Sequence, residues 1–379
     1  GREVRQLTNL PQGARVHYFR QERHLQDGRI IAWYAHENGS ASPRRTDIML
    51  IDPESGDVEF PKHRPGAFLA VLNSGKAVYT TGDEKREVWA MTLPDGGPEL
   101  IGSIPQEAPG ALHSPRNLHN ITCDGRTILL VSAQIPQPAG PLPCTDDVND
   151  SSGFWRHIYR PRSGDLYAYN LDDETFTCCV HLDRCSFQHI DPSPSDPGLV
   201  KFAQDVLGVF EQRAWTVRTD GSELRKIKPQ RKGEWVHHEF WWPDGQFIGY
   251  KYVDRRNDPT VHELPWGELA PRPLQLGIAD LTGREVYLSE PLCCFQSHLF
   301  VSPKGDMVSG EGTLGHSFVY AAPFSWSDYD IDLQPLATVH TPYNLGSAQS
   351  VEAGFSADSR WLIYNDTVDG KFQVCAVRV

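Results

Sequence analysis

A unit of two apolar strands joined by a glycine-containing turn returns along this chain at intervals of roughly fifty residues. It is clearest at residues 238–250, where His-Glu-Phe-Trp-Trp-Pro-Asp-Gly leads through a turn into a second strand, Gln-Phe-Ile-Gly-Tyr. Seven such units follow one another, and no helical pattern separates them. This repetition predicts an all-β chain folded as a seven-bladed β-propeller.

The two ends of the chain bear on how such a ring closes. We expect the N-terminal strand at residues 4–8 to complete the last blade, because this removes two exposed sheet edges. The prediction is a single propeller domain over residues 1–379, and a two-sheet sandwich is the alternative. Two long segments, 134–164 and 254–272, are expected to form loops above one face, where ligands bind.

The net charge of −13 argues against a general binder of nucleic acid or of anionic membranes, since both need a positive field. It is compatible with a small acidic substrate that a few arginines hold locally. No apolar run is long enough to cross a bilayer, and no segment is typical of a dedicated oligomer interface. We therefore expect a soluble monomer.

Cysteines and glycosylation sequons indicate the compartment. The even number of cysteines, eight, permits disulfides with any pairing, and the lack of paired CxxC spacing argues against a structural zinc site. The N-x-Ser/Thr sequons outnumber what chance would give and lie at Asn38, Asn120, Asn149 and Asn365. They predict a secreted, extracellular glycoprotein, unless they are accidental features of polar turns.

Histidines stand at the openings of several predicted units. Because equivalent positions of a propeller converge on one axis, imidazoles there can move protons or bind a divalent metal. A single histidine at a strand opening is more often a structural hydrogen-bonding group. The histidines concerned are His17, His119, His189, His298 and one of the pair His237 and His238.

His238 is the candidate general base, in apolar surroundings that would keep its imidazole neutral. Neighbouring side chains alternate along a strand, so only one of His237 and His238 can face the axis. The alternative is a structural role for His238, packed at the edge of the core against the rings of Phe240 and Trp242.

Arg213 and the segment at residues 349–352 are candidates for binding ions. The planar guanidinium of Arg213 can hold a substrate carboxylate with two hydrogen bonds, and the alternative is a surface ion pair with Glu211 or an adjacent acid. Gln349 and Glu352 can offer oxygen ligands to a cation, and the alternative is a solvated loop.

Taken in order, these segments resemble the oligogalacturonate lyase family of seven-bladed propellers. The resemblance is strongest from residue 188 to about residue 312 and returns weakly at residues 349–364. The His-Glu-Phe-Trp-x-Pro-Asp-Gly string is its most specific part. The other matching strings are Gln188-His189, Arg213-Ala-Trp-Thr-Val-Arg-Thr-Asp-Gly and Ser297-His298-Leu.

The resemblance implies that His238 is the Brønsted base and that Arg213 contacts the substrate. It also implies a manganese site, held by the histidine matching His298 and by a Gln-x-x-His-x-His run. In this chain the run reads Gln349-Ser-Val-Glu352-Ala-Gly354, with glutamate and glycine in place of the two histidines. A calcium site rich in oxygen ligands, or no metal, is therefore as open as manganese.

The implied activity is that of a polysaccharide lyase, which cleaves a 1,4-glycosidic bond at a uronic acid by β-elimination. The altered run and the expected secretion favour an enzyme that releases rhamnose from rhamnosyl-α-1,4-glucuronate ends of arabinogalactans of the gum arabic type. The alternative is an oligogalacturonate lyase acting on pectin fragments. Hydrolysis by the carboxylates of Glu239 and Glu352, and a non-catalytic propeller that binds glycan or protein, are further alternatives.

In an elimination, a cation such as Arg213 or a metal ion neutralises the uronate carboxylate, a base takes the C5 proton, and the O4 leaving group departs. His189 or Tyr159 would protonate the leaving oxygen. The expected substrate contacts are His17, His119, Trp242 and Tyr159.

Overall fold

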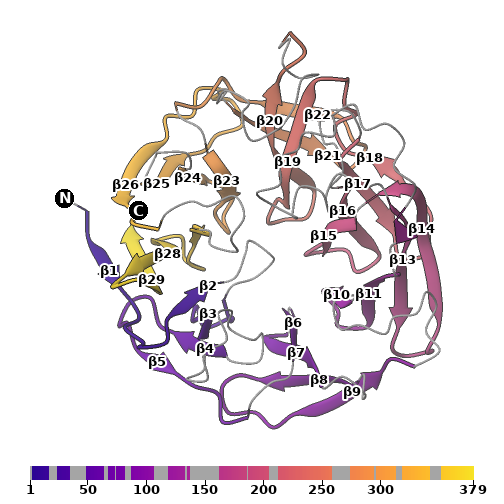
Figure 1. The fold of residues 1–379 in the computed structure, drawn as a ribbon, viewed down its shortest axis with the longest axis horizontal. Helices are drawn as coiled ribbons and strands as arrows, with labels where there is room; N and C mark the ends of the chain where they lie inside the picture. The colour runs from indigo at the N-terminus through magenta and orange to yellow at the C-terminus, as the bar shows by residue number, and fades with distance from the viewer. Residues whose placement is uncertain are drawn as a thin grey trace.

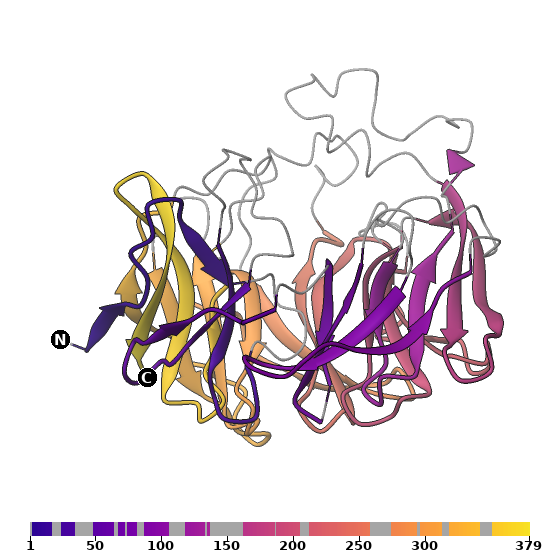
Figure 2. The ribbon, with the colours of Figure 1, turned by 90° about the horizontal axis from the view of Figure 1, so that it is seen from below.

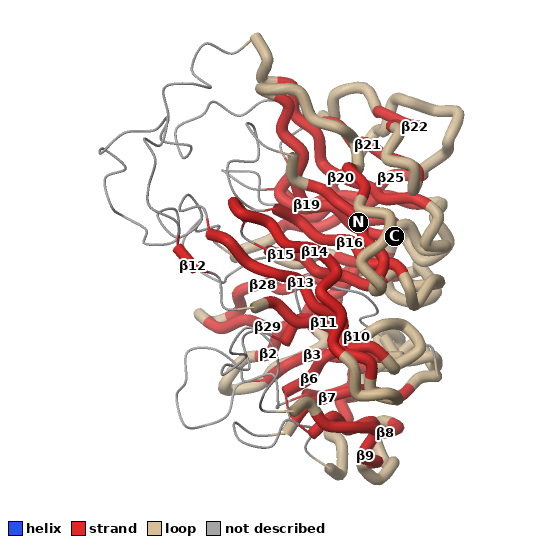
Figure 3. The backbone as a smooth tube through the Cα atoms, turned by 90° about the vertical axis from the view of Figure 1, so that its right-hand side faces the viewer, coloured by secondary structure: helices blue, strands red, loops and turns tan. Residues whose placement is uncertain are grey.

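The predicted seven-bladed propeller is confirmed: seven antiparallel sheets form a ring in this computed structural model (Figure 1). Strands and loops make up the described residues, with no helix among them (Figure 3). The structure describes residues 2–16, 24–34, 48–63, 67–72, 74–81, 87–105, 118–132, 135–136, 162–185, 187–204, 212–257, 274–293, 296–312, 318–341 and 351–379.

Each of blades 1 to 6 is built from consecutive strands, four in each blade except blade 3, which has five. Blade 1 has β2 (Ala14–Val16), β3 (Ile30–Tyr34), β4 (Ile48–Ile51) and β5 (Val58–Glu59). Blade 2 has β6 (Ala67–Val71), β7 (Lys76–Thr80), β8 (Glu87–Thr92) and β9 (Glu99–Ser103). Blade 3 has β10 (Leu118–Ile121), β11 (Thr127–Val131), β12 (Ile135–Pro136), β13 (Arg162–Asn170) and β14 (Phe176–Cys185).

The second half of the ring repeats this order. Blade 4 has β15 (Phe187–Pro192), β16 (Leu199–Gln204), β17 (Ala214–Arg218) and β18 (Arg225–Lys226). Blade 5 has β19 (Glu234–Trp241), β20 (Phe247–Asp254), β21 (Gln275–Asp280) and β22 (Glu285–Leu288). Blade 6 has β23 (Gln296–Val301), β24 (Met307–Gly312), β25 (Phe318–Pro323) and β26 (Gln334–Thr338).

Blade 7 joins the two ends of the chain. It combines β27 (Gly354–Phe355), β28 (Trp361–Val368) and β29 (Lys371–Arg378) with the N-terminal strand β1 (Val4–Gln6). Strand β1 pairs antiparallel with β29, with Val4 opposite Val377 and Gln6 opposite Cys375. The predicted closure by the N-terminal strand is therefore confirmed, and the chain ends lie side by side (Figure 1).

The hydrophobic core is divided into seven clusters, one at each junction between neighbouring blades. The cluster between blades 4 and 5 contains Val236 and Tyr250, and the cluster between blades 5 and 6 contains Val253 and Leu299. Each sheet is thus covered on both faces, which explains why its strands read as apolar runs with little polar alternation. Seven separate sheets also exclude the two-sheet sandwich.

The strands stand along the ring axis, and the first strand of blades 2 to 6 lies nearest that axis (Figures 1 and 2). The Pro-Asp-Gly sequence closes the inner hairpin of blade 5, where Gly245 has φ +72°. A side chain at Gly245 would clash with Ser195 of blade 4, so this turn needs glycine both for its backbone conformation and for its packing. The turn fixes the end of β19. It therefore also fixes how far from the turn, along the ring axis, each residue of β19 lies.

Two of the four sequon asparagines are buried within or beside strands. Asn120 lies in β10, and Asn365 in β28 exchanges hydrogen bonds with the backbone of Val16. Neither side chain is open to glycosylation in the folded protein, so these two sequons give no support for secretion, which stays a prediction. Four of the described cysteines are free thiols: Cys123, Cys178, Cys179 and Cys375.

The long segments expected as loops, 134–164 and 254–272, lie mostly outside the described residues. Within the described part of the chain, no helix has the length and hydropathy to span a bilayer.

Candidate active site

Four consecutive blades carry a candidate site residue at the same structural position. In each of blades 4 to 7, one backbone N–H bonds across the inner hairpin next to its turn; the donors are Ser193, Trp242, Ser302 and Ser356. Counting back four residues from each donor gives His189, His238, His298 and Glu352. Equivalent positions of a ring face the same axis, so these four side chains are brought together by symmetry rather than by closeness in sequence.

The backbone at this position departs from regular strand geometry. The pairing register shifts between Gln188 and Asp191 in blade 4 and between His237 and Phe240 in blade 5, as it does at a β-bulge. His189 and His238 have φ of 48° and 51°, in the left-handed region that non-glycine residues rarely occupy. Bulges of this kind redirect a side chain, and strained backbone of this kind is typical of functional sites.

The structure brings three of the predicted histidines, His189, His238 and His298, into one group. The ring centroids of His238 and His298 are 4.4 Å apart, and those of His189 and His238 are 6.3 Å apart and nearly parallel. His237 packs edge-on against His238 at 5.4 Å and against Trp235 at 4.4 Å. His238, which contacts the histidines of both neighbouring blades, is therefore the member of the His237–His238 pair that joins this group.

Arg213 lies immediately before β17 and reaches across to blade 5. Its side chain is 1% exposed, and its Nε donates to Oε2 of Glu239 at 3.0 Å. Oε1 of the fully buried Glu239 lies 3.8 Å from Nδ1 of His189. The predicted ion pair of Arg213 thus exists, but it is buried and formed with Glu239; Glu211, the expected partner, lies outside the described residues.

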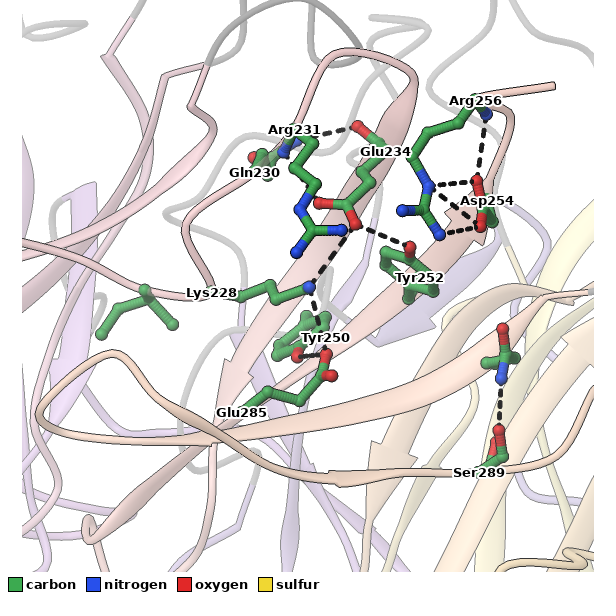
Figure 4. A network of polar contacts seen from close by, with 12 residues as sticks. Lys228, Gln230, Arg231, Glu234, Tyr250, Tyr252, Asp254, Arg256, Glu285 and Ser289 are labelled. Carbon is green, nitrogen blue, oxygen red and sulfur yellow. Dashed lines mark hydrogen bonds and ion pairs between the residues drawn. The ribbon is translucent and has the colours of Figure 1, made fainter. Parts of the chain in front are cut away.

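A second polar network, which includes Lys228, Gln230 and Glu234, lies at the junction of blades 4 and 5 (Figure 4). The backbone N–H of Arg213 donates to Oε1 of Gln230 at 2.7 Å, and Gln230 Nε2 donates to the carbonyl of Glu234 at 3.1 Å. The ammonium of Lys228 lies between Glu234 and Glu285, at 3.7 and 3.6 Å. These contacts hold the segment that carries Arg213.

Lys251 is the second buried cation of this region. It lies opposite His237 in the β19–β20 ladder and is 4% exposed. Tyr250 and Tyr252 pack toward blade 4 and Val253 packs toward blade 6, so strand alternation places Lys251 on the blade 6 side. Burial and the charge of Arg213 lower the pKa of Lys251 to about 7, although Glu311 acts in the opposite direction.

The electrostatic surroundings keep His238 neutral. Burial lowers its pKa well below the usual value, and the positive charges of Lys251 and Arg213 lower it further. The side chain still retains a partly exposed surface. A neutral imidazole is the form that can accept a proton, so His238 has the protonation state that a general base requires.

Blades 6 and 7 meet through a different carboxylate. Glu311 on β24 hydrogen-bonds Nδ1 of His298 and accepts the backbone N–H of Ala353 at 2.8 Å through its other oxygen. Glu352, next to Ala353, is buried and has φ 54°. Its charge also acts on Arg15 of blade 1. Burial lowers the pKa of Arg15, and the negative charge of Glu352 offsets part of this shift.

The described residues do not assemble a complete metal site. His298 and Glu352 are two of the three predicted ligands, and Gln349 lies outside the described residues. No group of three or more His, Cys, Asp or Glu side chains suited to a metal ion occurs in the described part of the chain. Two protein ligands do not define a manganese or calcium site, so no reaction step below passes through a metal.

Among the other predicted contacts, Trp242 is the one whose side chain the structure describes, and it lies outside this group. Trp242 is 4% exposed and packs against Phe324 and Trp326 in the core between blades 5 and 6, which does not support a substrate contact. This environment fits the alternative interpretation of the sequence, in which the ring of Trp242 is a packing group at the edge of the core. His17 and Tyr159 lie outside the described residues, and His119 lies on β10 with its side chain not described.

Comparison with known proteins points in one direction. No family model matches the chain. Among curated proteins, it is 27% identical over 121 residues to the oligogalacturonide lyase of Pectobacterium atrosepticum, covering 32% of this chain and 27% of that protein. It is 36% identical over 58 residues to the oligogalacturonate lyase of Dickeya dadantii, covering 15% of each. The matches span only about a quarter or less of these relatives.

Solved structures match over the full length. An oligogalacturonate lyase in complex with manganese superposes with a TM-score of 0.71 and 17% identity, covering 100% of this chain and 93% of that chain. The oligogalacturonate lyase of Vibrio parahaemolyticus gives a TM-score of 0.70 and 16% identity, with 100% and 94% coverage. This chain has the fold of oligogalacturonate lyases. The manganese of the first structure agrees with the expectation that such a propeller can take a divalent metal.

Proposed function

We propose that this protein is a polysaccharide lyase, which cleaves the 1,4-bond at a uronic acid by β-elimination. The observation that carries the proposal is the neutral His238, placed at the ring axis between two further histidines and beside the buried cations Arg213 and Lys251. The likeness to oligogalacturonate lyases in fold and in short sequence segments supports the same class of reaction. Fold alone would not suffice, because propellers host many functions.

The chemistry follows from the charges around His238. The C5 proton of a uronate is weakly acidic because the adjacent carboxylate resists further negative charge, so a cation must first offset that charge. Arg213 and Lys251 supply positive charge here. His238 then takes the C5 proton, the C4–O4 bond breaks, and His189 protonates the departing oxygen. The product carries a carbon–carbon double bond between C4 and C5.

Substrate binding also prepares the base. The positive neighbours that lower the pKa of His238 in the free protein would be partly offset by the incoming carboxylate. The imidazole therefore becomes more basic when the uronate is in place and stays unprotonated when it is not. This coupling explains how a histidine surrounded by cations can still remove a proton.

Oligomers of 4-linked galacturonate are the preferred substrates in this proposal. The relatives reported above carry the oligogalacturonate lyase name, and this supports galacturonate over rhamnosyl-glucuronate. Rhamnosyl-α-1,4-glucuronate ends are the second candidate. The observation in favour of them is the replacement of the family's two histidines by Glu352 and Gly354, beside the predicted substrate position.

The test is incubation with a panel of oligogalacturonates, rhamnosyl-glucuronate glycans and other uronate polymers, with and without a chelator. Elimination gives an unsaturated uronate, which absorbs in the ultraviolet, and mass spectrometry shows no added water. Hydrolysis adds one water per cleaved bond and would overturn the proposal. So would binding of these glycans without any new chromophore. Retained activity in chelator would show that Arg213 and Lys251 suffice without a metal.

Hydrolysis by Glu239 and Glu352 has little structural support. Glu239 is fully buried, and one of its oxygens is bound to Arg213. A hydrolase needs one carboxyl group that protonates the leaving oxygen and a second that activates water or attacks the sugar. A carboxylate held by a guanidinium is a poor proton donor, so Glu239 fits a positioning role better.

A further inference from the structure

Lys201 is a fully buried lysine whose ammonium holds three acceptors from two blades. It lies on β16, directly opposite Asp191 in the β15–β16 ladder, and is 0% exposed. Its Nζ donates to Oδ2 of Asp191 at 2.8 Å, to the carbonyl of Glu239 at 3.1 Å and to the carbonyl of His189 at 3.4 Å. A lysine ammonium has three protons, and each has an acceptor here.

The two carbonyls belong to the two bulges of the site. His189 is the left-handed residue in the irregular part of β15, and Glu239 directly follows the left-handed His238 in β19. A bulge interrupts the ladder and leaves backbone groups there without their regular strand partners. Lys201 therefore binds two irregular segments on neighbouring blades through one charged group. Trp241 of blade 5 reinforces the link, since its indole N–H donates to the carbonyl of Asp191 at 3.1 Å.

We propose that Lys201 is a positioning residue, which holds the backbone of both bulges so that His189 and His238 face the substrate at a fixed separation. This inference rests on the proposed function, in which His238 removes the C5 proton and His189 protonates the leaving oxygen. The rings of these histidines are 6.3 Å apart and nearly parallel. A displacement of about 1 Å between such groups can cost roughly a hundredfold in rate.

A purely stabilising role is a weaker explanation for this pair. The energetic cost of removing two charges from water often equals or exceeds their attraction in the interior, and apolar replacements of similar size are commonly neutral or stabilising. The pair Lys201–Asp191 is buried where blade 4 meets blade 5, in surroundings closed to water. What an apolar pair cannot supply is a donor to the carbonyls of His189 and Glu239.

The experiment replaces both charges at once, in the double variant Lys201→Met with Asp191→Leu. We expect thermal unfolding close to that of the unmodified protein, a kcat lowered about 10- to 100-fold, and a KM changed less than threefold. The matched control is Arg218→Met with Asp196→Asn, which removes the ion pair of blade 4 that joins these residues at 3.1 Å on partly exposed side chains. The control should leave kcat unchanged.

A second measurement does not depend on activity. Nuclear magnetic resonance of the imidazole rings should show changed shifts for His189 and His238 in the double variant and unchanged shifts in the control. If the unmodified protein cleaves no uronate, the proposed function fails but the imidazole shifts still test Lys201. A folded double variant with unmodified kcat and unmodified histidine resonances would overturn the inference. If the double variant does not fold, Asp191→Asn alone provides the test, because it keeps the volume and weakens the hold on Lys201.

Discussion

Two blade junctions meet at the ring axis, and they are built alike but charged differently. At the junction of blades 4 and 5, the buried Glu239 binds Nε of Arg213 and lies 3.8 Å from Nδ1 of His189. At the junction of blades 6 and 7, Glu311 hydrogen-bonds His298 and accepts a backbone N–H of blade 7. In each case one carboxylate lies near a histidine and ties two blades together.

The difference lies in the other charges. Glu239 is matched by the permanent cation Arg213, and Lys251, on the blade 6 side of the same sheet, adds positive charge near both Arg213 and Glu311. At the other junction Glu311 stands near a second buried carboxylate, Glu352, whose described cationic neighbour is Arg15 of blade 1. The first junction is suited to an anion such as a uronate carboxylate, and the second to a cation or a proton. One ring thus presents two unlike halves to a single ligand.

The largest expected effect comes from His238, which stands between the two junctions. His238→Ala should lower kcat about 100- to 10,000-fold, because it removes the proposed base while leaving both carboxylate links in place. The measurement is the rate of ultraviolet absorbance increase on the substrate found by the panel. His181→Ala is the control, since His181 is an exposed histidine that bonds Asp165 on blade 3. A variant that folds and keeps more than half of the rate would remove His238 from the mechanism.

The two carboxylates can be compared directly with isosteric amides. Glu239→Gln leaves the guanidinium of Arg213 buried without its counter-charge, so we expect a loss of about 3 kcal/mol in the free energy of unfolding. Glu311→Gln leaves a histidine that can be neutral, so we expect a loss nearer to about 1 kcal/mol. Denaturant unfolding of the two variants gives both numbers. Equal losses would show that the junctions do not differ in the way their charges suggest.

Replacing Lys251 tests whether the buried cations of the site, Arg213 and Lys251, bind the carboxylate of the uronate substrate. Lys251→Met should slow the cleavage of a free uronate about 10- to 100-fold, since a buried cation near the acid group is lost. The same variant should lose far less activity on the methyl ester of that uronate, whose carboxyl group carries no charge. Because one preparation is assayed on both substrates, a folding defect affects both equally. Lys228→Met, at the polar network of blades 4 and 5, is the control. An unchanged ratio of the two rates would exclude Lys251 from carboxylate binding.

Much of this arrangement could be predicted from the repeat. His189, His238 and His298 each begin the pattern His-x-x-x-(Ser or Trp)-Pro, and Glu352 begins the same spacing with Ala in place of Pro. Once the ring is predicted, this spacing places all four on one axis. It is also the signal that would have assigned Glu352 to the position of the histidines rather than to a solvated loop.

The partners of these residues could not be predicted, for a physical reason. Strand alternation assigns each side chain to a face, but one bulge reverses the assignment for every residue beyond it. The contacts of Glu239, Glu311 and Lys201 depend on where the bulges fall in β15, β19 and β23. Arg213 shows the consequence, because its buried partner Glu239 belongs to the next blade and is not indicated by the sequence around Arg213.

The smallest expected effect is a pH dependence of the free energy of unfolding in the free protein. This measurement isolates the charge of Lys251. The pKa of Lys251 is about 7 in the folded protein, below the ordinary value of 10.5 that applies when the chain is unfolded. Between these values the unfolded chain binds one proton more than the folded protein, so Lys251 does not oppose folding above pH 10.5 and opposes it increasingly as the pH falls toward 7. Unmodified protein should therefore gain about 1 to 2 kcal/mol over Lys251→Met between pH 7 and pH 9, measured by denaturant unfolding.

Three charged or titratable neighbours of Lys251 do not change their charge across this window. Arg213 stays charged, and His237 and His238 stay neutral because their pKa values lie well below 6.5. Parallel curves for the two proteins would mean that Lys251 keeps an ordinary pKa, and its positive charge would then already be compensated in the free protein.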